Sequence, residues 1–341
     1  YIKVISLTKR PTFEEIWTVL FNKSTSYFVL ACSLITTISC VMFYIQFLQE
    51  YIIILIRSIY PELPKVFNNY IISGSIITML FIVPSAFIER KSTLGIISYI
   101  QLFCVILIII GIVFWLVVGI EENGFNPNGE MVLFRFDRHL IACVSSLLTA
   151  YIIVPLAWPS PGDVKNATVK SLNNIFILVF VILFIVYFGV GIASYFTFFD
   201  SNEGELLLSL YHDHVMTFIM RISLIVSLIL SCPILFNHGR KLTISAALDS
   251  NERPNSVNWI CVGFVIAILA FIFGGITGKS YDVICFISDT VNPFLLFIFP
   301  GMMYLKGYGM KNLFHVIGAI IEIIVGLLGI VLIWYGYLAP T

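Results

Sequence analysis

The sequence predicts an all-α polytopic membrane protein, and its composition and patterning carry that prediction. Hydrophobic residues make up 59% of the 341 positions and charged residues 11%, and the mean hydropathy is +1.01. Soluble domains are typically about 45–50% apolar and about 25% charged. The apolar residues also gather into runs that are near or above the roughly 20 residues that a helix needs to cross a bilayer.

The chain opens with a charged segment, residues 1–23, in which Thr12 and Glu15 have the spacing of a helix-capping box. We expect this segment to be a cytoplasmic loop that contains a short amphipathic helix on the membrane surface. Residues 24–338 are expected to form one transmembrane domain. Nine apolar runs in it are predicted to span the membrane, at about 24–57, 70–89, 94–120, 140–160, 174–199, 206–236, 256–276, 280–305 and 313–338.

The distribution of Lys and Arg supports this count and places the start of the chain in the cytoplasm. If the loops alternate, thirteen of the 19 basic residues lie on the side of the first segment and five on the opposite side, and Arg221 lies within a span. Short cytoplasmic loops carry an excess of Lys and Arg. The bias therefore favours a cytoplasmic start.

The run 140–161 is poorly suited to a regular helix. Ser145, Ser146 and Thr149 can compete for backbone hydrogen bonds, and Pro155 lacks an N–H and clashes with the preceding turn. We interpret the run as a broken membrane helix. In hydrocarbon such a break persists only where protein covers it or where it lines a polar cavity, and secondary transporters bind substrate at such breaks. A proline-kinked helix without a ligand is the alternative.

Three stretches resemble parts of the amino acid/auxin permease family. RISLIVSLILSCPILFNHGRK (221–241) resembles its eighth helix, FGVGIASYFTFFD (188–200) its seventh helix and exit, and SDTVNPFLLFIFPGMMYLK (288–306) its tenth helix. The resemblance covers nearly the whole chain and is to the neutral and vacuolar amino acid carriers. It implies a LeuT-type inverted-repeat fold of eleven helices, in which the nine spans are helices three to eleven. The first two helices, and with them half of the substrate site, are then expected to lie outside this sequence.

The break and the resemblance together give candidates for substrate binding. The broken sixth helix should expose backbone groups to the substrate, and the small Ala150 leaves room for a side chain. Tyr44 resembles the third-helix tyrosine that faces the cavity in the family, with Cys40 one turn earlier on the same face. Back-bonding of the hydroxyls within the helix, and plain packing of Tyr44, are the alternatives. The substrate-binding candidates are Ser145, Ser146, Thr149, Ala150, Tyr151 and Tyr44.

Three further residues are candidates for ion coupling, with either H⁺ or Na⁺ as the ion. In sodium-coupled relatives a hydroxyl before the eighth-helix proline is an ion ligand, and Ser231 matches that position, with Ser227 on the same face. Alternatively, these serines satisfy themselves within the helix. Asp289 is an ionisable residue inside a span, which makes it a functional candidate. It could titrate with proton coupling, or it could form a permanent ion pair with Arg221.

These features predict a secondary transporter that moves an amino acid by alternating access. There is no nucleotide-binding loop or nucleophile elbow, and the seven cysteines lie in apolar runs without metal-ligand spacing. We therefore expect no enzyme activity, no cofactor, no metal and no nucleic-acid partner. The expected partners are an amino acid and membrane lipid, in a plasma membrane or a vacuolar or lysosomal membrane. A channel is disfavoured because no ring-forming filter motif is present. An amino-acid-sensing receptor on the same fold remains the alternative.

Overall fold

The computed structural model describes residues 13–60, 69–88, 91–123, 168–198, 214–247, 256–275, 278–309 and 313–338, together with residues 4, 8, 147, 150 and 151. Every regular element within these residues is a helix, as the predicted all-α class requires. Six helices are long and apolar enough to cross a membrane, and two shorter apolar helices cover Ile71–Ser85 and Asn258–Phe273. Eight of the nine predicted spans fall on these helices. The ninth, 140–160, lies outside the described residues apart from Leu147, Ala150 and Tyr151.

The chain divides into two compact units, and the helices α3 and α10 each contribute one end to both. Unit 1 comprises Tyr1–Phe43, Phe136–Asn174 and Ile234–Thr341, and unit 2 comprises Tyr44–Arg135 and Ile175–Pro233. Unit 1 contains α2 (Phe13–Leu20), the first part of α3 (Lys23–Ile59), the last part of α10 (Val215–Ala247), α11 (Ser256–Gly275), α12 (Gly278–Pro293), η5 (Phe294–Ile298), α13 (Phe299–Tyr308) and α14 (Leu313–Leu338). Unit 2 contains the rest of α3 and α10, α4 (Tyr70–Ile77), η2 (Thr78–Ile82), α5 (Val83–Ser85), α6 (Lys91–Asn123) and most of α8 (Val169–Phe198).

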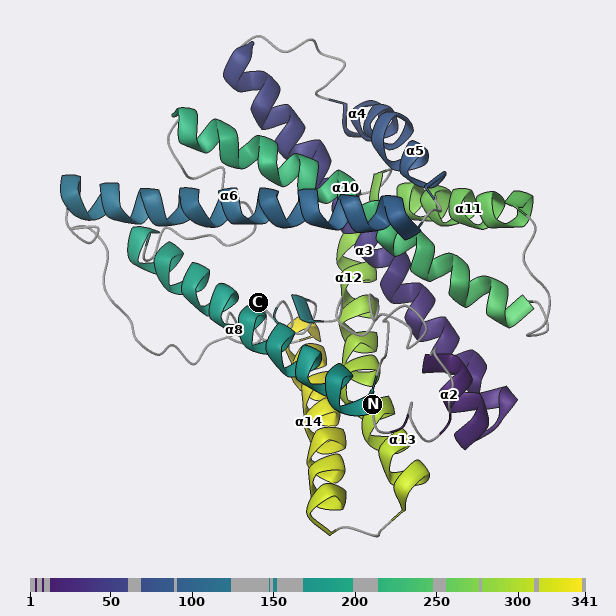
Figure 1. Ribbon diagram of the computed structural model, residues 1–341. Helices are drawn as coiled ribbons and strands as arrows, with labels where there is room; N and C mark the ends of the chain where they lie inside the picture. The colour runs from purple at the N-terminus through teal and green to yellow at the C-terminus, as the bar shows by residue number, and fades with distance from the viewer. Residues whose placement is uncertain are drawn as a thin grey trace. The chain divides into compact units, whose positions relative to one another are not determined.

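In unit 1, α12, η5 and α13 follow one another as one column that packs along α14 (Figure 1). Two glycines allow the close approach. A Cβ atom on Gly301 would lie 2.9 Å from the carbonyl oxygen of Ala319, and one on Gly326 would lie 3.3 Å from the carbonyl oxygen of Pro293. Any larger residue at Gly301 would therefore push the two helices apart.

Two π-helices, η2 and η5, interrupt the apolar helices, and each ends two residues before a proline. In both, the residue after the π-helix, Val83 or Phe299, donates its amide hydrogen to the carbonyl of the π-helix's first residue. Pro84 or Pro300 comes next. A proline inside an α-helix clashes with the carbonyl four residues earlier, and the wider turn relieves that clash. In the sequence, the prolines indicate where these helices are interrupted, whereas the hydropathy of the runs 70–89 and 280–305 gives no sign of it.

The predicted end of the span at residue 236 does not coincide with the end of α10, which continues to Ala247. Hydropathy falls at the polar residues 237–241, but polarity alone does not end a helix. Arg240 is fully buried, and its guanidinium carbon lies 5.5 Å from the centre of the Trp259 ring on α11. A Cβ atom on Gly263 would collide with that guanidinium, so the glycine makes room for it. The part of α10 beyond the apolar run is therefore packed against α11 through Arg240.

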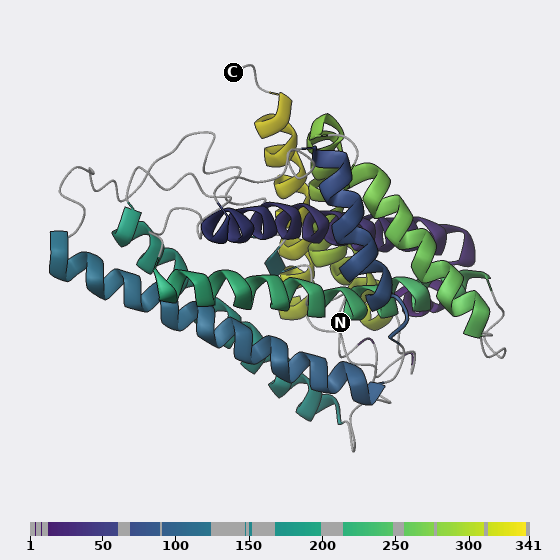
Figure 2. The same cartoon turned by 90° about the horizontal axis from the view of Figure 1, so that it is seen from above.

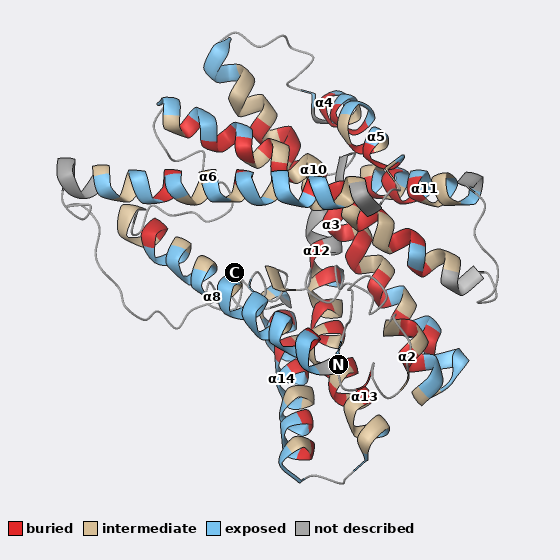
Figure 3. Cartoon of the chain, viewed as in Figure 1, coloured by how far each residue is buried: buried red, intermediate tan, exposed pale blue. Residues whose placement is uncertain are grey.

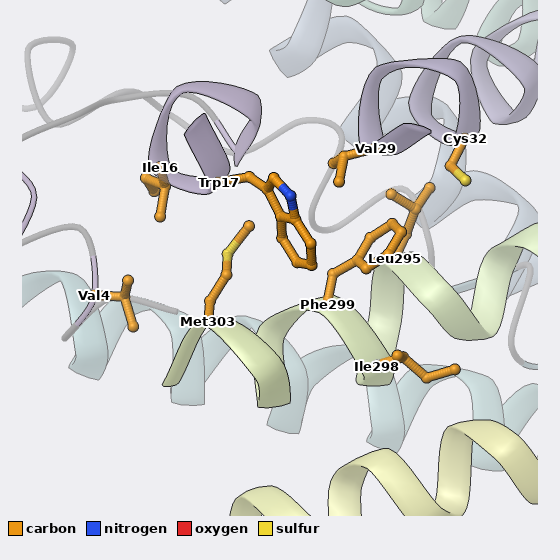
Figure 4. Close-up of a cluster of buried hydrophobic side chains, with 9 residues drawn as sticks. All are labelled: Val4, Ile16, Trp17, Val29, Cys32, Leu295, Ile298, Phe299 and Met303. Carbon is orange, nitrogen blue, oxygen red and sulfur yellow. The ribbon is translucent and has the colours of Figure 1, made fainter. Parts of the chain in front are cut away.

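An apolar cluster holds α2 within unit 1 (Figure 4). The Trp17 ring lies 5.0 Å from the Phe299 ring of α13, centre to centre, and its indole N–H donates to the Thr25 hydroxyl of α3 at 3.0 Å. The buried members are Val4, Ile16, Trp17, Val29, Cys32, Leu295, Ile298, Phe299 and Met303. The helix within the predicted loop 1–23 therefore packs its apolar side against protein.

In unit 2, α6 and α10 run antiparallel, side by side (Figure 2). Near one end the Trp115 indole N–H donates to the Thr217 hydroxyl at 3.0 Å, and the Gln101 amide donates to the Ser231 hydroxyl at 2.6 Å further along. The separation from 101 to 115 on α6 equals that from 217 to 231 on α10. At about 1.5 Å per residue, these two bonds fix the register of the helices over roughly 20 Å.

The apolar side chains of α8 are exposed over most of the helix, which Figure 3 shows in pale blue. It contains the most apolar stretch among the six long helices. An apolar helix that is exposed on nearly all sides is unstable in water but suits a lipid environment. This surface is consistent with a polytopic membrane protein.

Candidate substrate and ion site

The segment predicted to bind substrate lies largely outside the described residues. Ser145, Ser146 and Thr149 are not among them, so the roles of these three hydroxyls stay predictions. Ala150 and Tyr151 are described, and both are helical and half-buried. Both belong to unit 1.

Tyr44, the other substrate-binding candidate, lies on α3 and is half-buried. Cys40, one turn earlier, is buried. The division between the units falls between these two residues, so Tyr44 belongs to unit 2 and Cys40 to unit 1. The predicted contact of Tyr44 with substrate is not tested by this placement.

Ser227 and Ser231, the candidates for a sodium site, are both buried on α10. The Ser231 hydroxyl donates to the Ser227 carbonyl oxygen at 2.8 Å, which is the back-bonding that the sequence left open as an alternative. It also accepts a hydrogen bond from the Gln101 side chain of α6 at 2.6 Å. Ser231 thus uses its proton and one lone pair within the protein. Sequence reasoning missed Gln101, because no periodicity shows which residue of another helix faces a given serine.

Asp289, the candidate for proton coupling, is half-buried on α12. Its carboxylate accepts a hydrogen bond from the Tyr337 hydroxyl of α14 at 3.1 Å, and the indole N–H of Trp334 donates to the neighbouring Thr290 at 3.1 Å. Arg221, proposed from the sequence as a permanent partner of Asp289, is buried in unit 2, whereas Asp289 belongs to unit 1. Both the proton role and the ion pair stay predictions.

Glu14 of α2 is a buried acid that the sequence analysis did not single out. It is 7% exposed, and the Ser33 hydroxyl of α3 donates to its Oε1 at 2.9 Å. Burial raises the pKa of Glu14 to about 7, although hydrogen bonds from its own backbone and from Ser33 lower it, and the charge of Glu15 raises it further. Glu14 precedes Trp17 by three residues and shares its helix face, which is the signal that predicts an inward orientation.

Further polar side chains lie buried between α3 and α12 in unit 1. The Thr36 hydroxyl donates to the Asn292 side-chain oxygen at 3.4 Å, and each residue is 1% exposed. Ser33 lies one turn before Thr36, so we call Glu14, Ser33, Thr36 and Asn292 the acidic group. Polar residues inside apolar helices are costly unless they face protein or a water-filled cavity. They mark the inward faces of α3 and α12.

The described candidates therefore fall into two sets. Unit 2 holds what we call the neutral group, made of Gln101, Ser227 and Ser231, and also Tyr44. Unit 1 holds the acidic group, with Asp289 one turn before Asn292, and the described residues Ala150 and Tyr151. The structure joins Ser227 to Ser231, as their spacing predicted, and adds Gln101 and Glu14.

The sequence matches the family described as "Transmembrane amino acid transporter protein" over residues 3–339. It is 22% identical to "Sodium-coupled neutral amino acid symporter 2" of Danio rerio over 278 residues, which cover 74% of this chain and 55% of that protein. It is 24% identical to "Putative amino acid transporter AAT1" of Plasmodium falciparum over 192 residues, 55% of this chain and 30% of that protein. The chain thus spans at most about half the length of these relatives. Because the family match covers nearly all of the sequence, the chain belongs to the transmembrane amino acid transporter family, the amino acid/auxin permeases.

Proposed function

We propose that this chain forms part of a secondary transporter that moves an amino acid across a membrane by alternating access. The observation that carries the proposal is the family match over residues 3–339, on a chain whose long apolar helices enclose buried polar side chains. Buried polar groups in apolar helices are typical of transporters, in which they line a substrate or ion path. The positive-inside count supports a cytoplasmic location for residues 1–23.

The segment 140–160 is the moving part in this proposal, and the bundle that contains it rocks against a scaffold that contains α3 and α10. Neutral amino acids are the substrates that its composition supports. Residues 145–151 carry no charged side chain that could pair with a charged substrate, and Ala150 is small. The similar protein of Danio rerio is named as a symporter of neutral amino acids.

A gradient of protons or of sodium supplies the energy. Ser227 and Ser231 offer oxygen atoms to a sodium ion, whereas Asp289 offers a carboxylate to a proton. Neither ion needs a cofactor. Which of the two ions drives transport depends on the groups that surround these side chains.

The full-length protein in proteoliposomes tests the proposal. A panel of labelled amino acids is offered under an imposed proton gradient and, separately, under a sodium gradient, with empty liposomes as the control. We expect saturable, concentrative uptake of neutral amino acids under one gradient. Saturable binding without uptake under either gradient would contradict transport and support the receptor alternative.

Thr149→Val tests the substrate segment, because it keeps the shape of the side chain and removes the hydroxyl. We expect a several-fold rise in KM for the substrate with an unchanged folded yield. Thr197→Val is the matched control: the Thr197 hydroxyl bonds back to the Ala193 carbonyl on α8 at 2.8 Å. Its removal should leave the KM unchanged. Equal kinetics in both variants would remove Thr149 from the site.

A further inference from the structure

The central part of α10 has the oxygen atoms of a cation site. Ser227 and Ser231 lie one turn apart on one buried face, near the middle of a helix that runs from Val215 to Ala247. Pro233 lies inside the helix and has no N–H to offer to the carbonyl oxygen of Ile229. Two hydroxyls and a carbonyl at a proline are the kind of hard oxygen ligands that Na⁺ accepts.

A hydrogen-bond donor, the side-chain amide of Gln101, lies where a cation bound to Ser231 would lie. The Gln101 Nε2 atom of α6 lies 2.6 Å from the Ser231 Oγ atom and donates to it. Ser231 in turn gives its own proton to the Ser227 carbonyl oxygen at 2.8 Å. An amide NH₂ group carries two hydrogens with partial positive charge and no lone pair for a cation. A sodium ion bound to Ser231 would lie against these hydrogens.

The register of α6 on α10 fixes the position of Gln101. The Trp115–Thr217 hydrogen bond, at 3.0 Å, holds the same two helices in the same register further along. Between the two bonds, a Cβ atom on Gly111 would collide with the Met220 side chain, so the helices are in close contact there. Gln101 is therefore held on the face of α6 that lies opposite Ser231.

We propose that Gln101 determines the ion specificity of the carrier, by placing an amide donor on Ser231 where a sodium ion would need that oxygen. The inference rests on the proposed function as an ion-coupled transporter. Its consequence is that sodium does not bind at Ser231, and we expect the proton to be the coupling ion. In this respect the chain differs from what the name of its zebrafish relative states.

The test compares the full-length wild type with Gln101→Glu, which keeps the length of the side chain and replaces the donor by carboxylate oxygens. Thermal unfolding in detergent is measured with NaCl or with choline chloride at equal ionic strength, and uptake is measured under the same two salts. We expect wild-type unfolding and uptake to be the same in both salts. Gln101→Glu should gain a sodium-dependent rise in its unfolding temperature and at least a fivefold sodium stimulation of uptake.

Gln49→Glu is the matched control. The Gln49 amide donates to the Ser73 hydroxyl at 2.7 Å, so it is a second glutamine–serine pair in unit 2, and it joins α3 to the start of α4. We expect this variant to remain insensitive to sodium. An equal sodium response in both variants would mean that any added carboxylate attracts the ion, and it would overturn the specific role of Gln101.

The unfolding measurement separates this inference from the proposed function, because it needs no transport. Sodium stabilisation of the wild type that Gln101→Ala abolishes would overturn the inference and make Gln101 a sodium ligand. If the wild type is insensitive to sodium and Gln101→Glu is stabilised by it, the inference holds even if no amino acid is taken up. In that case only the transport proposal fails. If Gln101→Glu does not fold, sodium sensitivity of the wild type alone still decides against the inference, and an insensitive wild type together with sodium stabilisation of Gln101→Ala, which lacks the amide donor, supports it.

Discussion

The neutral group of unit 2 and the acidic group of unit 1 are both polar sites within apolar surroundings, but only the acidic group contains a titratable side chain. The neutral group, Gln101 with Ser227 and Ser231, contains no titratable side chain and lies in the middle of two long apolar helices. The acidic group contains Glu14, on a helix outside the long apolar spans, with a pKa of about 7. Of the two groups, only the acidic group holds a side chain that changes its charge with pH.

The largest effect is expected from a variant that removes the packing of α2, the helix that carries Glu14 of the acidic group. Trp17→Ala empties the space between α2, α3 and α13, and loss of a buried aromatic ring typically costs about 3–5 kcal/mol. We expect α2 to lose its protection from amide hydrogen exchange, measured by mass spectrometry over residues 13–20. Val19→Ala on the same helix is the control, because Val19 is 54% exposed. Unchanged protection in Trp17→Ala would contradict the packing of α2.

The pH response should come from Glu14. Its pKa in the folded chain, about 7, lies above the ordinary 4.5, so the folded state binds the additional proton between these two values. The contribution of Glu14 to stability is therefore most favourable below about pH 4.5 and falls as pH rises to about 7, by on the order of 3 kcal/mol. We expect hydrogen exchange of α2 to accelerate over this range.

Glu14→Gln should remove this pH dependence, because the amide still accepts the Ser33 hydrogen bond but does not titrate. Glu15→Gln, a half-buried neighbour, should keep most of it. If the two variants show the same pH profile as the wild type, Glu14 is not the titrating group.

A smaller effect is expected from Ser231→Ala in the neutral group. The substitution leaves the Gln101 amide without its acceptor on α10. An unsatisfied donor typically costs about 1–3 kcal/mol when it is buried, and because Gln101 is half-buried we expect a loss at the lower end of that range. Thermal unfolding of the full-length protein in detergent measures it. The double variant Gln101→Leu/Ser231→Ala should recover part of the loss, because neither polar group then remains. Strict additivity of the two single variants would show that the hydrogen bond contributes nothing.

The smallest effect is expected from Tyr337→Phe. It removes the hydrogen bond to Asp289, which is not fully buried, so water can replace the hydroxyl. The free energy of unfolding should fall by no more than about 0.5–1.5 kcal/mol, the net value of an ordinary hydrogen bond. A larger loss in the same detergent unfolding assay would mean that Asp289 depends on Tyr337 more than its exposure suggests.

Composition and hydropathy predicted the all-α class and most of the helices, because a helix that spans a bilayer has to be apolar along nearly its whole length. They did not predict that Glu14 is buried, since a charged residue in a short amphipathic helix is ordinarily exposed. They also did not predict the Gln101–Ser231 bond, because it depends on which faces of α6 and α10 oppose each other. The spacing of Ser227 and Ser231 lies within one helix, and for that reason it was predictable.

Proton movement coupled to substrate most directly tests the account that this chain is part of a proton-driven amino acid carrier. The full-length protein is placed in sodium-free liposomes that contain a pH-sensitive dye, and a transported neutral amino acid is added outside. We predict that the substrate causes acidification of the lumen at a rate that saturates with its concentration. Uptake that requires sodium and moves no protons would contradict both the proton as coupling ion and the role of Gln101.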